Sequence, residues 1–179
     1  NNKFLKIDEN VHNFIIRYSS EITTKAMKIF TFLGSTPFII GLCILLFVLF
    51  IIFKKKSTAY KCAGVLIIST LINNVVKVII RRPRPEYITV VEKTFSYPSG
   101  HTMASTTLYG FLIYYIWHEN FDKNYKIIFT IILSIIPILV GISRIYLGAH
   151  YFSDVIGGAF LSIAILTSID LLTYKKTSK

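Results

Sequence analysis

The chain contains five long apolar runs, at residues 37–53, 59–80, 101–117, 127–143 and 155–173. Each run is close to the ~20 residues that a helix needs to cross the hydrocarbon core of a membrane. Lipid offers no hydrogen bonds to the backbone, so such runs are stable there only as helices. Only 16% of the residues are charged, against about 25% in an ordinary soluble domain. The pattern predicts an all-α fold, a polytopic transmembrane helix bundle of five spans.

The formal net charge of +11 comes largely from lysine-rich stretches beside these apolar runs. Anionic lipid headgroups fit this placement. Nucleic-acid binding would instead need basic residues clustered on a soluble face with aromatic residues between them. We therefore predict membrane lipids, and no nucleic acid, as partners.

Lysines also indicate the topology, because cytoplasmic loops of membrane proteins are enriched in Lys and Arg. The loops 81–100 and 143–154 would then share the opposite, extracytoplasmic face. Short loops and a lysine-rich interior favour a multi-pass protein of a cell membrane, the bacterial plasma membrane. The lysines in the alternate, cytoplasmic loops are Lys54, Lys55, Lys56, Lys123, Lys126, Lys175 and Lys176.

The N-terminal part differs from the apolar runs. Residues 8–32 are less apolar and carry charges of both signs, which is typical of one amphipathic helix lying at the membrane interface. We expect a single domain, with an interfacial helix and loop at 1–36 and a transmembrane core at 37–179. The sequence begins with Asn1, and its first strong span runs from outside to inside. We therefore expect a sixth span upstream in the native protein.

The stretch "SRIYLGAHYFSD" at 143–154 places ionisable groups between two apolar runs, where a functional reason is the first expectation. Lys77, Arg84 and Arg144 supply cations on the same face, and the planar fork of arginine matches phosphate oxygens. The backbone N–H groups of Ser99 and Gly100 precede an apolar helix and can point at an anion. Together these groups predict an anion site, with phosphate as the obvious anion.

Two histidines accompany this anion site. His101 and His150 can exchange protons or attack phosphorus near neutral pH. Asp154 lies four residues after His150, one helical turn away if a helix begins there. Its carboxylate can then accept a hydrogen bond from one imidazole nitrogen and leave the other nitrogen free.

These residues form three motifs, K-x6-RP, PSGH and SR-x5-H-x3-D, in one order and on one predicted face. With them the chain resembles the type 2 phosphatidic acid phosphatase family, and the hydropathy pattern matches across nearly the whole chain. One departure is the absence of the first of six helices, which touches no motif. The motif positions are Lys77, Arg84-Pro85, Pro98-Ser99-Gly100-His101, Ser143-Arg144, His150 and Asp154.

The resemblance implies a membrane phosphatase acting on a lipid-linked phosphate. His150 would be the nucleophile that forms a phosphohistidine, and Asp154 would orient it. His101 would protonate the leaving group and then activate the water. Candidate substrates are undecaprenyl diphosphate, phosphatidylglycerol phosphate, phosphatidic acid and diacylglycerol pyrophosphate. The residues that would hold the phosphoryl oxygens are Lys77, Arg84, Ser99, Gly100 and Arg144.

No cofactor and no metal are expected. Two-metal phosphatases need several carboxylates around the ions, and the outer motif loops offer only Glu86, Glu92 and Asp154. Two alternatives stay open: a lipid phosphotransferase with the same site, and a non-enzymatic transporter or structural membrane protein. Vanadium haloperoxidases are wider relatives of the family, but they are soluble, which argues against that activity for this apolar chain. The motifs carry no signal for an oligomeric state.

Other polar and aromatic residues receive structural interpretations. Arg81 and Arg82 are expected to anchor headgroups, and Pro83 and Pro85 to end the second span. His12 is expected to be structural, and His118 falls on the inner face. Tyr97, Tyr146 and Tyr151 are expected in an interfacial aromatic belt, and Cys43 and Cys62 as buried free thiols.

Overall fold

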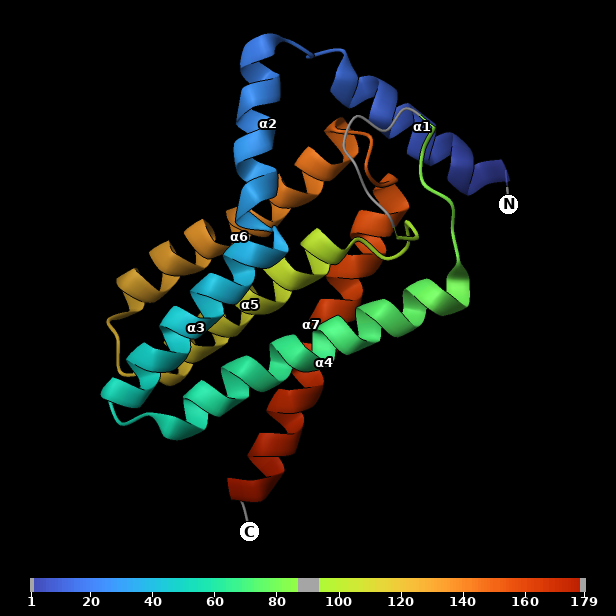
Figure 1. Cartoon of the computed structure of the whole chain (residues 1–179). Coiled ribbons are helices and arrows are strands. Elements are labelled where there is room, and N and C mark those ends of the chain that lie inside the picture. Colours follow the sequence, from blue (N-terminus) through green and yellow to red (C-terminus); the bar gives the residue numbers. More distant parts are fainter. Residues whose placement is uncertain (1, 87–93, 178–179) are drawn as a thin grey trace.

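The computed structural model describes residues 2–86 and 94–177, and all regular secondary structure in these residues is helical (Figure 1). This confirms the predicted all-α class. The helices are α1 (Asn2–Ile16), α2 (Glu21–Leu33), α3 (Thr36–Ile52), α4 (Lys56–Ile80), α5 (Gly100–His118), α6 (Lys123–Tyr146) and α7 (Phe152–Thr177).

The five predicted apolar runs correspond one to one to the helices α3 to α7. By length and composition alone, α4 and α6 can each cross a membrane. The pair α2 and α3 meets the same criterion together, but with a bend of 46° at the break between them. The transmembrane helical fold is confirmed, and crossing by all five helices stays a prediction.

Many large apolar side chains point away from the bundle. Ile44 on α3, Ile79 on α4 and Ile138 on α6 are 60%, 70% and 59% exposed. Apolar surface spread over several helices in this way is not stable in water, and it suits a hydrocarbon surrounding. The outward faces therefore support the membrane assignment independently of helix length.

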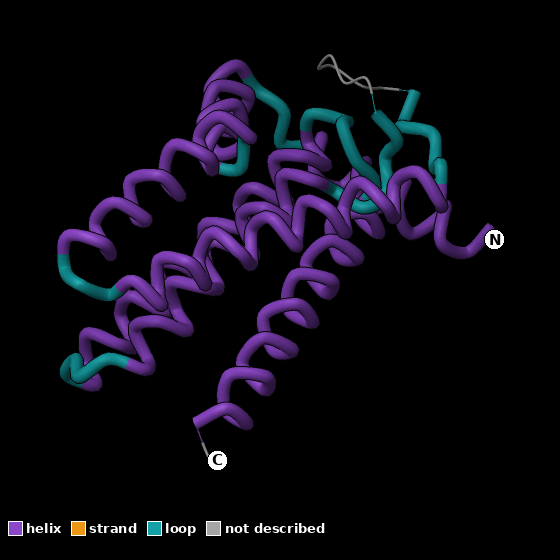
Figure 2. The backbone as a smooth tube through the Cα atoms, turned by 60° about the horizontal axis from the view of Figure 1, so that its bottom comes forward, coloured by secondary structure: helices purple, strands orange, loops and turns teal. Residues whose placement is uncertain are grey.

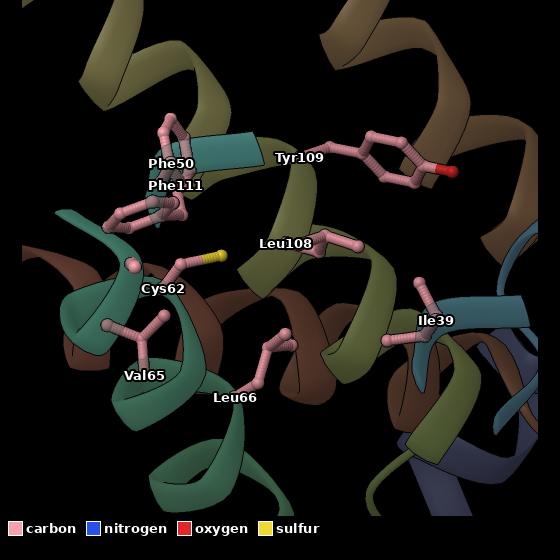
Figure 3. Packing of buried hydrophobic residues seen from close by; sticks show 9 residues of the cluster. Ile39, Phe50, Cys62, Val65, Leu66, Leu108, Tyr109 and Phe111 are labelled. Atoms are coloured by element: carbon pink, nitrogen blue, oxygen red, sulfur yellow. The ribbon is translucent and has the colours of Figure 1, made fainter. Parts of the chain in front are cut away.

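The helix α5 lies at the centre and packs against α3, α4, α6 and α7 (Figure 1). Its side chains also join those of α3 and α4 in one cluster of buried residues, which extends from the far end of the bundle to the cavity described below (Figure 3). We call this the apolar cluster. Its members are Ile39, Phe50, Ala59, Cys62, Val65, Leu66, Leu108, Tyr109 and Phe111.

The three motif segments meet at the other end of the bundle, where the loops gather near α1 (Figure 2). Helix α4 ends there at Arg81, which has a left-handed φ of 50°. Helix α5 begins there with Ser99 as its N-cap. The first turn of α7 contains Asp154, whose negative charge is favourable at a helix N-terminus. The lysine-containing turns between α3 and α4 and between α5 and α6 lie at the far end (Figure 1).

The prediction of one continuous helix over residues 8–32 is wrong, whereas its position at the membrane interface stays a prediction. The segment forms α1 and α2, which are separated by residues 17–20. Ser20 caps α2 by accepting a hydrogen bond from the Thr23 backbone N–H, so a second helix begins there. Side chains of α1 are also buried in the bundle, including Asp8 and His12. The division at residue 36 stays a prediction.

Candidate active site

The structure brings the three motifs together around one cavity of about 720 Å³. The last turn of α4 contributes Lys77, the following loop Arg84, and the loop between α6 and α7 His150. Gly100 and His101 line the cavity from the first turn of α5. Five of the eight predicted site residues therefore line one cavity, although up to 73 positions of sequence separate them.

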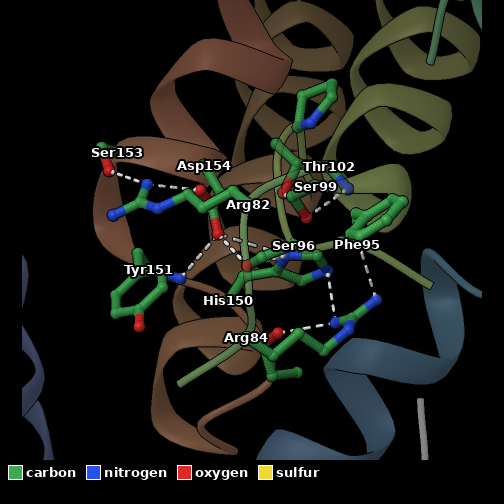
Figure 4. Close-up of polar contacts among 12 residues, drawn as sticks. Arg82, Arg84, Phe95, Ser96, Ser99, Thr102, His150, Tyr151, Ser153 and Asp154 are labelled. Carbon is green, nitrogen blue, oxygen red and sulfur yellow. Dashed lines mark hydrogen bonds and ion pairs between the residues drawn. The ribbon is translucent and has the colours of Figure 1, made fainter. Parts of the chain in front are cut away.

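His150 and Asp154 form the pair that their spacing predicts. Nδ1 of His150 lies 3.5 Å from Oδ2 of Asp154, and both side chains are almost fully buried. The hydroxyl of Ser96 donates a short hydrogen bond to the same Oδ2 and lies 3.5 Å from Nδ1 (Figure 4). The carboxylate is thus held behind the imidazole, on the side away from the cavity.

The other face of the imidazole meets Arg84. Nη1 of Arg84 lies 3.3 Å from Nε2 of His150 and donates to the Ala149 carbonyl at 2.7 Å (Figure 4). A guanidinium can only donate, so Nε2 acts as the acceptor and the proton belongs on Nδ1. This tautomer puts a lone pair on the nitrogen that faces Arg84 and the cavity.

Electrostatics favour the same neutral form of His150. Burial lowers its pKa from the usual 6.5 to about 4, and the nearby Arg144 and Arg84 also disfavour a proton. The hydrogen bond to Asp154 acts in the opposite direction but does not outweigh them. A buried imidazole among cations is uncharged at neutral pH, which is the state that a nucleophile needs.

The PSGH loop is held against α4. The Lys77 ammonium donates to the Phe95 carbonyl at 2.5 Å. Asn73, one turn earlier on α4, donates from Nδ2 to the Pro98 carbonyl at 3.3 Å. Asn73 also lines the cavity, and no motif pointed to it. Its amide fixes the loop that presents Gly100 and His101.

Two predicted phosphate-binding residues are engaged elsewhere. The Ser99 N–H donates to the Asp154 backbone carbonyl at 3.1 Å, and the Ser99 hydroxyl accepts from Thr102. Nη1 of Arg144 donates to the Thr31 hydroxyl on α2 at 2.9 Å. Neither side chain lines the cavity. Their contacts with phosphate stay predictions, whereas Ser99 serves here as a helix cap that joins α5 to α7.

Sequence reasoning assigned Arg82 to the headgroups, and that assignment is wrong. Its guanidinium turns inward and bonds Asp154 Oδ1 at 2.6 Å (Figure 4), and it bonds Asp8 Oδ2 at 2.7 Å. Its neighbour Arg81 is exposed and donates from Nε to the Val78 carbonyl. Adjacent arginines in one loop thus differ completely, and only the tertiary partner of Arg82, the distant Asp8, explains why.

Ser96 was also missed. It lies two residues before Pro98, outside all three motifs, yet it is fully buried against Asp154. A serine in a loop is usually a solvent contact, so its sequence context offers no signal. The predicted aromatic belt also needs correction, because Tyr146 is buried and its hydroxyl bonds Thr24 on α2.

The remaining side-chain predictions have mixed outcomes. His12 is buried and bonds the Ile145 carbonyl at 3.1 Å through Nδ1, as a structural residue. His118 lies at the far end of α5. Both cysteines are free thiols, but Cys43 is only half-buried. Tyr151 lies in the site region, with its ring 4.0 Å from the Arg82 guanidinium.

The side chains that could bind a metal ion are His, Cys, Asp and Glu. Among the side chains that the structure describes, in residues 6–86 and 94–168, no three His, Cys, Asp or Glu come close enough to hold a metal ion together. Asp154 is bonded to Ser96 and Arg82 instead. The prediction of a metal-free reaction stays a prediction that activity measurements can test.

The helical bundle and its site are consistent with a membrane lipid phosphatase, and the comparisons with known proteins support that class. Residues 58–178 match the family model described as PAP2 superfamily, and the chain belongs to this superfamily. It is 31% identical over 176 residues to phosphatidylglycerophosphatase B of Bacillus subtilis (strain 168), covering 90% of this chain and 87% of that protein.

Solved structures show the same fold. The crystal structure of a transmembrane PAP2 type phosphatidylglycerolphosphate phosphatase from Bacillus subtilis matches with a TM-score of 0.90 and 29% identity. That match covers 98% of this chain and 88% of the other. Aquifex aeolicus LpxE matches in fold with a TM-score of 0.73 and 22% identity, over 90% and 93% of the two chains.

Proposed function

We propose that this protein hydrolyses a lipid-linked phosphate on the extracytoplasmic face of the membrane, through a phosphohistidine at His150 and without a metal. The observation that carries the proposal is the buried His150, whose Nε2 faces a cationic cavity while Asp154 lies behind Nδ1. This arrangement combines an activated nucleophile with groups that stabilise a phosphoryl anion.

The shape of the cavity supports an amphiphilic substrate. At one end it is lined by Lys77, Arg84 and the two histidines. It continues between α3 and α4 along side chains such as Ile40 and Ile67. A phosphate at the polar end would therefore leave a lipid tail beside apolar helices. A soluble phosphate ester gains nothing from the apolar part.

In the first step, Nε2 of His150 attacks phosphorus and forms a P–N bond while the P–O bond to the lipid breaks. His101 donates a proton to the departing oxygen, because an alkoxide is a poor leaving group. Asp154 stabilises the positive charge that develops on the imidazole, through Nδ1. Lys77 and Arg84 offset the negative charge that grows on the phosphoryl oxygens.

In the second step, water attacks the phosphohistidine and the P–N bond breaks. His101, now neutral, accepts a proton from that water. Inorganic phosphate leaves and His150 returns to its neutral form, so both histidines end in their starting states. Protons and bonds balance without any co-reactant other than water.

Phosphatidylglycerol phosphate is the first substrate to test, because the Bacillus subtilis relative with 31% identity and the Bacillus subtilis crystal structure with 29% identity are both named as phosphatases of it. Undecaprenyl diphosphate, phosphatidic acid and diacylglycerol pyrophosphate complete the panel. Phosphate release from purified protein with each lipid, in excess EDTA, tests the reaction and its metal independence together. Loss of activity that only magnesium restores would overturn the metal-free mechanism.

The same assay separates hydrolysis from the two alternatives. A phosphotransferase would release phosphate slowly in water and modify an added alcohol or lipid acceptor instead. A transporter would release none. The polar groups lie in the last turn of α4 and the first turn of α5, at one end of the helices. A transport site would lie nearer the bilayer midplane.

The sidedness needs its own experiment. In a background where both native cysteines are replaced by alanine, one cysteine is placed at Glu86 or at Asp122, which are both exposed. An impermeant thiol reagent should label intact cells that carry the Glu86 variant and spare those that carry the Asp122 variant. The reverse pattern would place the site in the cytoplasm.

A further inference from the structure

The helix α1 contributes one fully buried carboxylate to the site region. Asp8 is 1% exposed, although in the sequence it lies near the N-terminus and far from every motif. Its Oδ1 accepts from the Ser153 backbone N–H at 2.8 Å, and its Oδ2 accepts from the Ser153 hydroxyl at 2.8 Å. Asp8 thereby caps the start of α7, one residue before Asp154.

Asp8 also bonds Arg82, which connects it to the catalytic pair. The guanidinium of Arg82 lies between two carboxylates, with Nη2 2.7 Å from Asp8 Oδ2 and Nη1 2.6 Å from Asp154 Oδ1. Nη1 also bonds the Ser153 hydroxyl at 2.6 Å. A planar fork held at both branches has little freedom to turn. Arg82 is not among the residues that line the catalytic cavity.

Each oxygen of Asp154 has its own set of partners. Oδ1 accepts from Arg82, whereas Oδ2 accepts from Ser96 and from the Tyr151 backbone N–H at 3.0 Å. Oδ2 is also the oxygen that faces Nδ1 of His150. Because Arg82 fixes Oδ1, the rotation of the carboxylate is fixed, and so is the position of Oδ2 behind the imidazole.

We propose that Asp8 and Arg82 are positioning residues for the nucleophile: Asp8 fixes Arg82, Arg82 fixes Asp154, and Asp154 holds His150. The chain of contacts makes α1 part of the catalytic apparatus, although α1 lies outside all three motifs. This inference rests on the proposed role of His150. It assigns to Asp8 and Arg82 no contact with substrate.

The series of contacts from Asp8 to His150 has an electrostatic effect in addition to its effect on orientation. Arg82 brings a positive charge close to Asp154, and Asp8 offsets part of it. Removal of the cation should therefore favour protonation of His150, and removal of Asp8 should disfavour it. The charged groups that act on His150 directly are Asp154 from α7, Arg144 from α6 and Arg84 from the loop after α4. Lys77 from α4 and His101 from α5 line the same cavity, and Arg82 and Asp8 connect to His150 through Asp154.

The opposite effects of the two variants on the protonation of His150 distinguish a positioning role from a merely structural one. In the pH profile of kcat/KM, the acid limb reports the nucleophile of the free enzyme. For Arg82→Gln the limb should move to higher pH by about one unit, the effect of one charge several ångströms away. For Asp8→Asn it should move to lower pH by a smaller amount. The substrate titrates identically in every variant, so the differences belong to the protein.

Turnover gives a second readout. Arg82→Gln should lower kcat about tenfold or more, as loss of an outer partner of a reacting group commonly does. KM should change less than threefold, because the cavity is intact. Arg82→Lys should recover part of kcat, since one ammonium can bond one of the two carboxylates. Arg81→Gln is the matched control and should match the wild type in kcat and in the pH profile.

The double variant tests whether Asp8 acts on Asp154 through Arg82. If Asp8 acts through Arg82, adding Asp8→Asn to Arg82→Gln should lower kcat no further, whereas independent effects would multiply. All rates are expressed per folded protein, measured by gel filtration and thermal unfolding in detergent. This correction keeps the test valid for a variant that folds poorly.

The outcomes separate this inference from the proposed function. If the wild type hydrolyses none of the four lipids, the proposed function fails. If the wild type is active and both variants keep its pH profile and its kcat per folded molecule, the positioning role is wrong. A shift of the acid limb in the same direction for Arg82→Gln and Asp8→Asn would also overturn it.

Discussion

The two ends of the bundle are stabilised by different kinds of interaction. The apolar cluster joins α3, α4 and α5 through buried side chains, each of which makes many weak contacts (Figure 3). At the other end a set of buried polar groups, which we call the polar network, joins α1, α7 and two loops through a few specific bonds. Figure 4 shows the part of it around His150 and Asp154. Its members are Asp8, Arg82, Arg84, Ser96, His150, Ser153 and Asp154.

This difference determines what each end tolerates. An apolar side chain of similar volume can replace another with a loss under about 1.5 kcal/mol. Removal of one partner in the polar network leaves a buried charge or hydroxyl unpaired, and that loss is larger and specific to the partner. The apolar cluster should therefore control stability, and the polar network should control catalysis.

The largest effect is expected at the nucleophile. His150→Ala should lower phosphate release at least about a thousandfold, because no other group can accept the phosphoryl group. Asp154→Asn should leave a folded but strongly impaired enzyme, since Nδ1 loses the carboxylate that stabilises its charge. Phosphate release per folded protein is the measurement. Retention of more than a few percent of activity by His150→Ala would contradict the covalent mechanism.

His101→Ala should give the next largest effect, with selectivity for the leaving group. Cleavage of an alkyl phosphate should fall about a hundredfold or more, since its oxygen leaves only with a proton. p-Nitrophenolate leaves without one, so a burst of p-nitrophenol from p-nitrophenyl phosphate should persist. Steady turnover should still be slow, because His101 also activates water. Equal loss of the burst and of alkyl-phosphate cleavage would reduce His101 to a binding residue.

A matched change in the apolar cluster should have the opposite character. Leu108 is fully buried on α5, and Leu108→Ala should destabilise the fold by about 3 kcal/mol through the lost burial and the cavity left behind. Activity per folded molecule should stay within about twofold of the wild type. Thermal unfolding in detergent measures the first quantity and lipid hydrolysis the second. A tenfold loss of specific activity would show that the two ends are not separate.

The smallest effect is the pH dependence of stability. His150 has a pKa of about 4 in the folded protein and 6.5 ordinarily. Below pH 6.5 the unfolded chain therefore binds a proton that the folded one does not, and stability falls as the pH decreases toward about 4. The slope should be about 1 kcal/mol per pH unit. His150→Gln should lack this contribution, whereas Leu108→Ala should retain it.

The sequence predicted the helices and the charged end of the cavity, since both depend on local patterns. Apolar runs indicate helices in lipid whatever their neighbours are, and the fixed motif spacings placed His101 and His150 together. The break at residues 17–20 was missed because the Ser20 cap competes with a continuous amphipathic pattern. The burial of Asp8 and Ser96 depends on partners 145 and 58 positions away, and no local pattern encodes such a pairing.

The hydrogen bond between Arg84 and His150 has a consequence for selectivity. At 3.3 Å it is a long bond, and the lone pair that it covers is the one that attacks in the proposed mechanism. An anion that drew the guanidinium toward itself would uncover this lone pair, whereas a neutral molecule would not. The proposed mechanism therefore predicts selection by charge before any bond forms, so that alcohols and unphosphorylated lipids of the surrounding membrane would leave Nε2 of His150 covered.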